Sequence, residues 1–170
     1  MIKWLRKIVS MPLRAWRSRG FGVHSPFAFG FITGVLRSNG GGYYAYESIG
    51  SSSQARRLYR IILSLAPETV VVTGPLDDAC SVAVSLSRSE AAAASRSPKL
   101  AVVPPEAVVG ISYLRTILAA GGAVVFTDIR DARSAEILAE ISPAGMTFAG
   151  LRQAIVVGGN LPRQTFPLLI

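Results

Sequence analysis

The sequence has almost none of the residues that hold soft metals or cross-link a chain. Its 170 residues include one cysteine, Cys80, and one histidine, His24. One cysteine excludes a disulfide framework within the chain, and no Cys/His spacing resembles a zinc site. These features fit a reducing compartment, so we expect a cytoplasmic location.

Long hydrophobic runs are also missing, although hydrophobic residues make up 50% of the chain. No uncharged apolar stretch approaches the roughly 20 residues that a membrane-spanning helix needs. Lys3, Arg6 and Lys7 interrupt the start of the chain, where a secretory signal would need an apolar core.

Acidic residues are scarce in the first third of the chain. Residues 1–60 hold ten Lys and Arg against the single acid Glu47, a net charge of +9, whereas residues 61–170 carry −1. This asymmetry, together with the motifs below, predicts a basic N-terminal helical extension over residues 1–50 and an α/β domain over residues 51–170.

A basic amphipathic helix is predicted over residues 2–17, with a kink at Pro12. Two interpretations of this helix stay open. Its apolar face docks on the body of the protein, or residues 1–20 lie on an anionic membrane surface and bring the protein to the inner face of the membrane. Nucleic acid is the weaker candidate partner, because no recognition motif or aromatic platform accompanies the charge.

Two further helices follow before the first strand. Ser25 and Pro26 are typical of a helix start, and Ser51–Ser53 open a second helix that ends before Pro67. The second helix is expected to bury an apolar face and to turn its arginines toward solvent. The apolar residues are Leu58, Ile61, Ile62 and Leu65, and the arginines are Arg56, Arg57 and Arg60.

From residue 69 onward, short apolar strands alternate with helices, which predicts a mostly parallel sheet covered on both faces. The expected strands are 69–73, 100–103, 123–127, 146–149 and 151–157. The expected helices are 79–88, 104–118 and 131–141, with Asp77 or Asp78 capping the first and Asp131 capping the last.

Three segments together resemble a bacterial family of class I S-adenosylmethionine-dependent methyltransferases. They are the GVHSPFAF run at 22–29, the YYAYE run at 43–47 and the AVVFTDI run at 123–129. The resemblance covers nearly the whole chain. It implies a Rossmann-like sheet with N-terminal helices and S-adenosylmethionine as the cofactor.

This chain is shorter than the resembled family by two strand–helix units. The polar segment 87–99 stands where the family has them, so the resemblance implies a sheet of about five strands. The implied order is 69–73, 100–103, 123–127, 151–157 and 146–149. The first strand then becomes an edge, which predicts a partner or a second copy covering it. A right-handed crossover predicts that helix 79–88 is displaced from the face of the family's first helix, unless segment 87–99 routes around.

The expected cofactor site departs from the family at the turn after the first strand. Gly74 matches the family's first glycine, but Val72 stands at the position of its acid and Asp78 at that of a later glycine. The resemblance assigns cofactor binding to Gly74, Asp77 and Asp78. A helix cap is the simpler interpretation of Asp78.

The acid that holds the cofactor ribose, and the carboxylates of metal-dependent relatives, have few counterparts here. The strand that would supply the ribose acid is missing. Pro104, Thr127 and Asp128 stand at the metal positions, and one carboxylate is too few for magnesium. We therefore expect no metal, and Asp128 is the one catalytic candidate, with a turn or cap role equally open.

Three functional hypotheses follow. The first is a truncated methyltransferase-like protein with weak or no activity. The second is an active small-molecule methyltransferase with an atypical cofactor site built from substitutes such as Asp77, Asp78, Glu47 and the tyrosines at 43–46. The third is a non-enzymatic module that binds a membrane surface or another protein.

Overall fold

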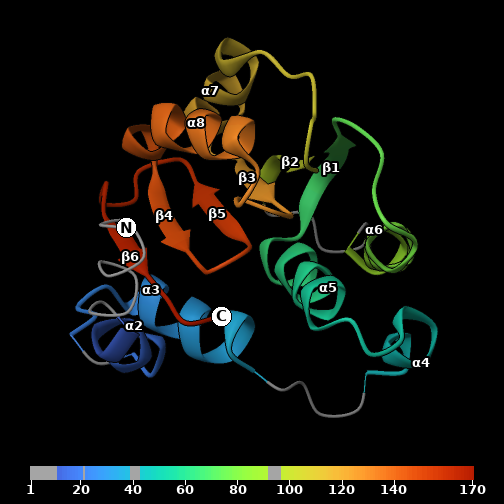
Figure 1. Cartoon of the computed structure of the whole chain (residues 1–170), viewed down its shortest axis with the longest axis horizontal. Coiled ribbons are helices and arrows are strands. Elements are labelled where there is room, and N and C mark those ends of the chain that lie inside the picture. Colours follow the sequence, from blue (N-terminus) through green and yellow to red (C-terminus); the bar gives the residue numbers. More distant parts are fainter. Residues whose placement is uncertain (1–10, 21, 39–42, 92–96) are drawn as a thin grey trace.

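The computed structural model describes residues 11–20, 22–38, 43–91 and 97–170, and it shows an α/β fold built on one six-stranded mixed sheet (Figure 1). The strands, in spatial order, are β1 (Pro67–Val72), β2 (Ser97–Val103), β3 (Ala123–Phe126), β5 (Ala154–Val157), β4 (Met146–Ala149) and β6 (Thr165–Pro167). Strands β1, β2 and β3 are parallel, β5 runs antiparallel to both of its neighbours, and β6 is parallel to β4.

The expected α/β class and the order of the five expected strands are confirmed, with β1 at one edge. The expected number of strands was one too few. Strand β6 was missed because it has only three residues, of which Phe166 alone is fully buried. Such a segment carries no alternation of apolar and polar residues over the length that marks a strand.

Helices occupy both faces of the sheet. Their bounds are α2 (Met11–Ser18), α3 (Pro26–Gly30), α4 (Ala45–Ile49), α5 (Ser53–Leu65), α6 (Asp78–Ala91), α7 (Ile111–Ala119) and α8 (Ala132–Ile141), with a π-helical turn η1 (Phe31–Leu36) and a 3-10 turn η3 (Ser142–Ala144). Three predicted starts are confirmed by caps, because Ser25, Ser52 and Asp131 each accept an N–H from the first turn of the helix that follows. Within the described ranges, no helix combines the length and the apolar composition needed to cross a bilayer.

One predicted helix begins later than expected. We expected a helix from Pro104, but α7 starts at Ile111 and residues 104–110 form a loop. Glu106 has a φ of 60° in this loop, a left-handed conformation that a right-handed helix cannot contain.

Helix α2 is the described part of the predicted helix 2–17, and residues 1–10 lie outside the described residues. It docks on the C-terminal segment: Arg14 Nη1 donates to the Leu168 carbonyl at 3.2 Å, and the Leu169 N–H donates to Ser18 Oγ at 2.7 Å. Leu13 and Trp16, expected on its apolar face, remain 44% and 49% exposed.

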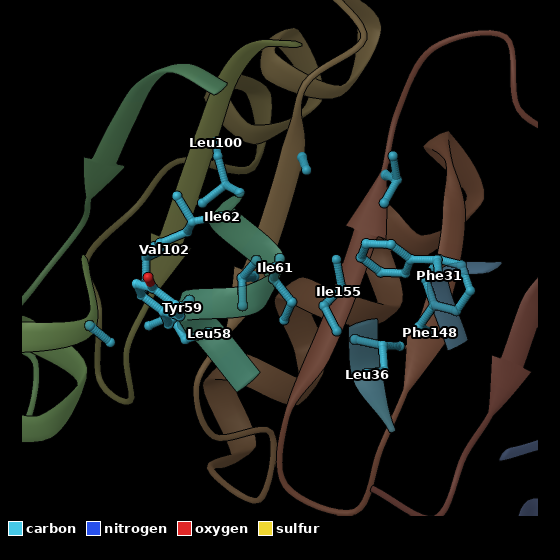
Figure 2. Close-up of a cluster of buried hydrophobic side chains, with 14 of the residues drawn as sticks. Phe31, Leu36, Leu58, Tyr59, Ile61, Ile62, Leu100, Val102, Phe148 and Ile155 are labelled. Carbon is cyan, nitrogen blue, oxygen red and sulfur yellow. The ribbon is translucent and has the colours of Figure 1, made fainter. Parts of the chain in front are cut away.

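The larger core lies between the sheet and helix α5. Figure 2 shows Leu58, Ile61 and Ile62 of α5 beside Leu100 and Val102 of β2. At the other end of this cluster, residues of η1 and of the antiparallel strands meet, namely Phe31, Leu36, Phe148 and Ile155. A smaller core on the opposite face joins α7 and α8 to the alternate residues of β2, β3 and β5.

Helix α6 lies on the same face as α5. Its buried residues Cys80, Ala83 and Val84 belong to the larger core, whereas α7 belongs to the smaller one. The steps from β1 to β2 and from β2 to β3 run in the same direction across the sheet, so helices on opposite faces mean crossovers of opposite hand. One of these two connections is therefore left-handed, whereas the right-handed rule was applied from sequence to the connection through helix 79–88. Because α6 packs chiefly against α5, we attribute the position of α6 on this face of the sheet to its contact with α5.

Candidate functional site

The turn after β1 is where the cofactor site was predicted. Gly74 follows the strand, but its open side faces protein: a Cβ there would meet Pro104 Cγ at 3.1 Å and the Cα of Ala107 at 3.6 Å. The glycine therefore lets the loop after β2 approach closely. A ligand that approached Gly74 from this side would occupy the same space as Pro104.

The two aspartates after this turn have separate positions. Asp77 caps α6, because its Oδ1 accepts the N–H of Cys80 at 2.7 Å. Asp78 is the first residue of α6, and both carboxylates are exposed. Cys80 is fully buried, and burial, followed by the nearby Asp77, raises the pKa of its thiol to about 12. A thiol with this pKa stays protonated and is a poor nucleophile at neutral pH.

A cavity of about 500 Å³ opens beside the outer strand β1. It lies between the end of the strand and α6, and its lining residues are Val72, Gly74, Leu76, Ser81, Val84, Ser85 and Arg88. Among the described lining residues, Gly74 is the one predicted cofactor residue and Arg88 is the one charged residue.

The residues around this cavity do not fit S-adenosylmethionine as the resembled family binds it. None of the lining residues is a carboxylate that could accept the ribose hydroxyls, and a guanidinium would face the sulfonium of the cofactor with like charge. The proposed tyrosine substitutes are not among these lining residues. Tyr43 and Tyr46 instead make edge-to-face contacts with Tyr59, at ring-centroid distances of 5.6 Å and 6.0 Å.

Asp128, the catalytic candidate, follows β3 and is held by two arginines. Arg130 donates from Nε to Asp128 Oδ1 at 3.0 Å and from Nη2 to Oδ2 at 2.5 Å, and Arg152 Nη2 lies 3.4 Å from Oδ2. The hydrogen bonds from the Arg130 side chain lower the Asp128 pKa to about 2. A carboxylate this acidic is a weak general base at neutral pH, so its geometry favours a structural turn.

Other side chains at the expected metal positions are apolar or buried. Thr127 is 3% exposed, and its carbonyl accepts a hydrogen bond from Gln54 Nε2. Among the described residues, no three His, Cys, Asp or Glu side chains gather into a group that could hold a metal ion.

A second polar cluster, which the sequence pattern did not predict, lies where α5 begins. Arg60 was expected to face solvent, and this is wrong, because it is 8% exposed and Arg57 is half-buried. Arg60 Nε donates to the Val35 carbonyl at 2.7 Å, and Arg57 Nε donates to the Leu36 carbonyl at 3.1 Å. These two carbonyls end η1, where helical carbonyls have no partner of their own.

Gln153 completes this cluster from the start of β5. Its side chain is fully buried, its Oε1 accepts from Arg57 Nη1 at 3.2 Å, and its Nε2 has no hydrogen-bond partner. The one sequence signal that could have pointed to this cluster is the position of a polar residue, Gln153, directly before the apolar run 154–157.

Comparison with known protein families, curated proteins and solved structures finds no match for this chain. The site is therefore interpreted from its own geometry.

Proposed function

We propose that the protein is an S-adenosylmethionine-dependent methyltransferase-like protein of Rossmann-like fold whose cofactor site is degenerate. In this proposal it does not bind the cofactor at millimolar concentration, and it transfers methyl groups slowly or not at all. The observation that carries the proposal is the strand order β1-β2-β3-β5-β4, with one antiparallel strand inserted between two parallel ones. It is the order implied by the resemblance once two strands are removed from the β1 edge.

The chemistry of the cavity beside β1 supports the loss of binding. Pro104 and Ala107 fill the side of Gly74 that a cofactor would approach, and Asp77 is committed to capping α6. With no carboxylate in the lining, the buried ribose hydroxyls would lack a strong acceptor.

Calorimetric titration with S-adenosylmethionine and S-adenosylhomocysteine tests this proposal. We expect no heat of binding and no thermal shift with millimolar ligand. The variant Val72→Asp combined with Asp78→Gly restores the family's residues at two positions, and a gain of binding in it would support degeneration of this turn. The matched control Asp131→Gly changes an aspartate at another helix cap. Micromolar binding by the unaltered protein would instead favour the active small-molecule methyltransferase.

The second candidate function is association with an anionic membrane surface through α2. It is favoured by the exposed side chains Met11, Leu13 and Trp16, which are 41%, 44% and 49% exposed. Apolar side chains on a basic helix insert at the headgroup boundary, while Lys and Arg contact anionic lipids.

Flotation with vesicles tests this second function. We expect the protein to float with vesicles rich in phosphatidylserine and to remain behind with phosphatidylcholine alone. Leu13→Ser combined with Trp16→Ser should abolish flotation, whereas Tyr44→Ser, at a side chain that is 91% exposed, should not. Flotation that is unaffected by the double substitution would remove α2 from the interaction.

A further inference from the structure

Two adjoining cavities surround the start of α5. Their volumes are about 430 Å³ and 280 Å³, and Ser53, Arg57 and Ile170 line both. Together they fall within the size range of sites for small molecules. We call them the α5 basin.

The lining of the α5 basin is strongly basic. Among the residues whose side chains the structure describes, five arginines line it, namely Arg37, Arg56, Arg57, Arg60 and Arg152, and no Asp or Glu side chain does. Asp128 contacts Arg152 at 3.4 Å, but it is already paired with Arg130.

Two of these guanidinium groups are withdrawn from water beside each other. Among the described residues, the acceptors for Arg57 and Arg60 are neutral oxygens: two carbonyls of η1, the Tyr46 hydroxyl and Gln153 Oε1. Burial, and secondarily the charge of Arg60, lower the pKa of Arg57. Buried charges are costly unless a counter-charge accompanies them, so this pair is short of negative charge.

Gln153 supplies an independent indication of the missing group. Its Oε1 accepts from Arg57, whose guanidinium group can only donate. Exchanging the positions of Oε1 and Nε2 would therefore place the amide NH2 donor against the guanidinium donor. The Nε2 donor is therefore fixed in place, buried and without an acceptor, on a residue that lines the smaller cavity. A ligand that accepts hydrogen bonds would complete it.

The first turn of α5 adds donors on the same side. Ser52 caps the helix by accepting the Ala55 N–H at 3.2 Å, and Ser53 and Gln54 occupy the first turn, where N–H groups lack helical partners. The positive end of this thirteen-residue helix thus meets the arginines and the unpaired amide.

We propose that the α5 basin binds the phosphate group of a small phosphorylated molecule, with Gln153 Nε2, Arg57 and the first turn of α5 as its donors. A phosphate monoester carries close to two negative charges and three acceptor oxygens, which matches a site lined by several hydrogen-bond donors. Leu36 and Leu169 also line the larger cavity, so an apolar moiety attached to the phosphate would have apolar side chains to contact. The proposal does not rest on the methyltransferase assignment.

Calorimetric titration with inorganic phosphate and with phenyl phosphate, at low and constant ionic strength, tests the site on the full chain. We expect both to bind, and benzoate at the same concentration to bind at least about tenfold more weakly, since it carries one charge and two oxygens. Absence of phosphate binding at millimolar concentration would overturn the proposal, as would benzoate binding as tightly as phenyl phosphate.

Gln153→Glu separates a ligand site from a structural contact. The carboxylate still accepts from Arg57, and pairing with that arginine should keep or raise the melting temperature, but the Nε2 donor is gone and the new charge repels an anion. We expect phosphate affinity to fall by about tenfold or more. The matched control Gln164→Glu makes the same change at an exposed residue and should leave phosphate binding unaltered. Equal phosphate affinity in Gln153→Glu and the unaltered protein would exclude Gln153 from the site.

The phosphate and cofactor experiments fail independently. Gln153→Glu should leave the titration with S-adenosylhomocysteine unchanged, whatever that titration shows for the unaltered protein. Phosphate binding with no cofactor binding would support both proposals, and cofactor binding with no phosphate binding would overturn both.

Discussion

Asp77 and Asp78 are adjacent in the chain, but they have different contacts at the start of α6. Asp77 accepts the Cys80 N–H at 2.7 Å, whereas Asp78 is exposed in the first helical turn. The cap hydrogen bond satisfies the Cys80 N–H, which has no partner within the helix. A carboxylate in the first turn, such as that of Asp78, interacts only with the helix dipole.

Substitution of each aspartate by alanine should therefore have unequal effects. We expect Asp77→Ala to lower the free energy of unfolding by about 1 kcal/mol, the usual effect of losing an N-cap. Asp78→Ala should lower it by about 0.3 kcal/mol, because it removes only the dipole interaction. Urea unfolding of the two variants measures the difference, and equal losses would contradict the assignment of Asp77 as the cap.

Asp128 should make the protein sensitive to acid over a defined interval. Its pKa falls from 3.8 to about 2 on folding, chiefly through the Arg130 hydrogen bonds, so its ionised form favours the folded state. This contribution is complete above pH 3.8 and is lost as the pH falls toward 2.

The variant Asp128→Asn should be less stable than the parent protein at neutral pH and should lose less stability across that acid interval. Denaturant unfolding at several pH values compares the two slopes. Asp78→Asn, at an exposed aspartate of α6, is the control and should keep the parental slope. Parallel curves for Asp128→Asn and the parent would contradict the role of the Arg130 contacts.

At the scale of single residues, sequence patterns predicted the helix caps better than they predicted the buried polar groups. Ser25, Ser52 and Asp131 follow local rules that depend on a few neighbouring residues. The burial of Arg60 depends on η1, which lies some 25 positions earlier in the chain and ends beside α5. No local rule places those carbonyls within reach of a guanidinium.

At the scale of elements, glycines determine how closely α7 approaches the sheet. A Cβ on Gly158 would lie 2.0 Å from the Leu118 carbonyl oxygen at the end of α7. The Gly158 N–H also donates to the Gly122 carbonyl at 2.8 Å, which joins the end of β5 to the turn before β3. A side chain at position 158 would therefore separate two backbone segments.

We expect Gly158→Ala to lower the free energy of unfolding by about 1–3 kcal/mol, as overpacking does. Gly30→Ala makes the same change in a helical conformation with no atom near the new Cβ, and it should be neutral or stabilise by about 0.5 kcal/mol. Thermal or urea unfolding compares them. Similar effects of the two substitutions would contradict the close contact.

The elements that sequence patterns predicted well are the ones whose burial is uniform along their length. All four residues of β3 and of β5 are buried, and both apolar runs were recognised. The helix expected from Pro104 failed because the chain passes over Gly74 before α7 begins, and this contact between two loops leaves no periodic signal. The face of α6 also depends on its packing against α5, which the crossover rule does not include.

At the scale of the whole molecule, the free edge of β1 is the feature that invites a partner. Within the part of the chain that the structure describes, β1 pairs with β2 alone, and Val72 at its end is 38% exposed. Unpaired strand edges form hydrogen bonds with other chains unless charge or cover prevents it.

We expect two copies of the protein to associate through β1, and sedimentation velocity over a range of concentrations measures this. Val72→Lys should shift the protein toward monomer, because a buried lysine at a strand pairing is costly. Val108→Lys, at an exposed valine in the loop before α7, is the control and should not. A parent protein that stays monomeric at millimolar concentration would contradict this expectation.

The opposite hands of the first two crossovers have a consequence for hydrogen exchange. Because α6 lies on the face of α5, the other face of β1 receives little cover, and Thr69 is exposed there while β3 is fully buried. Local opening is easiest where few apolar contacts must be broken. Amide protons of β1 should therefore exchange first among the three parallel strands, and those of β3 last. In a dimer joined at β1, the difference in exchange rate between β1 and β3 should become smaller. Exchange measured at two protein concentrations would therefore show which residues of the β1 edge are covered.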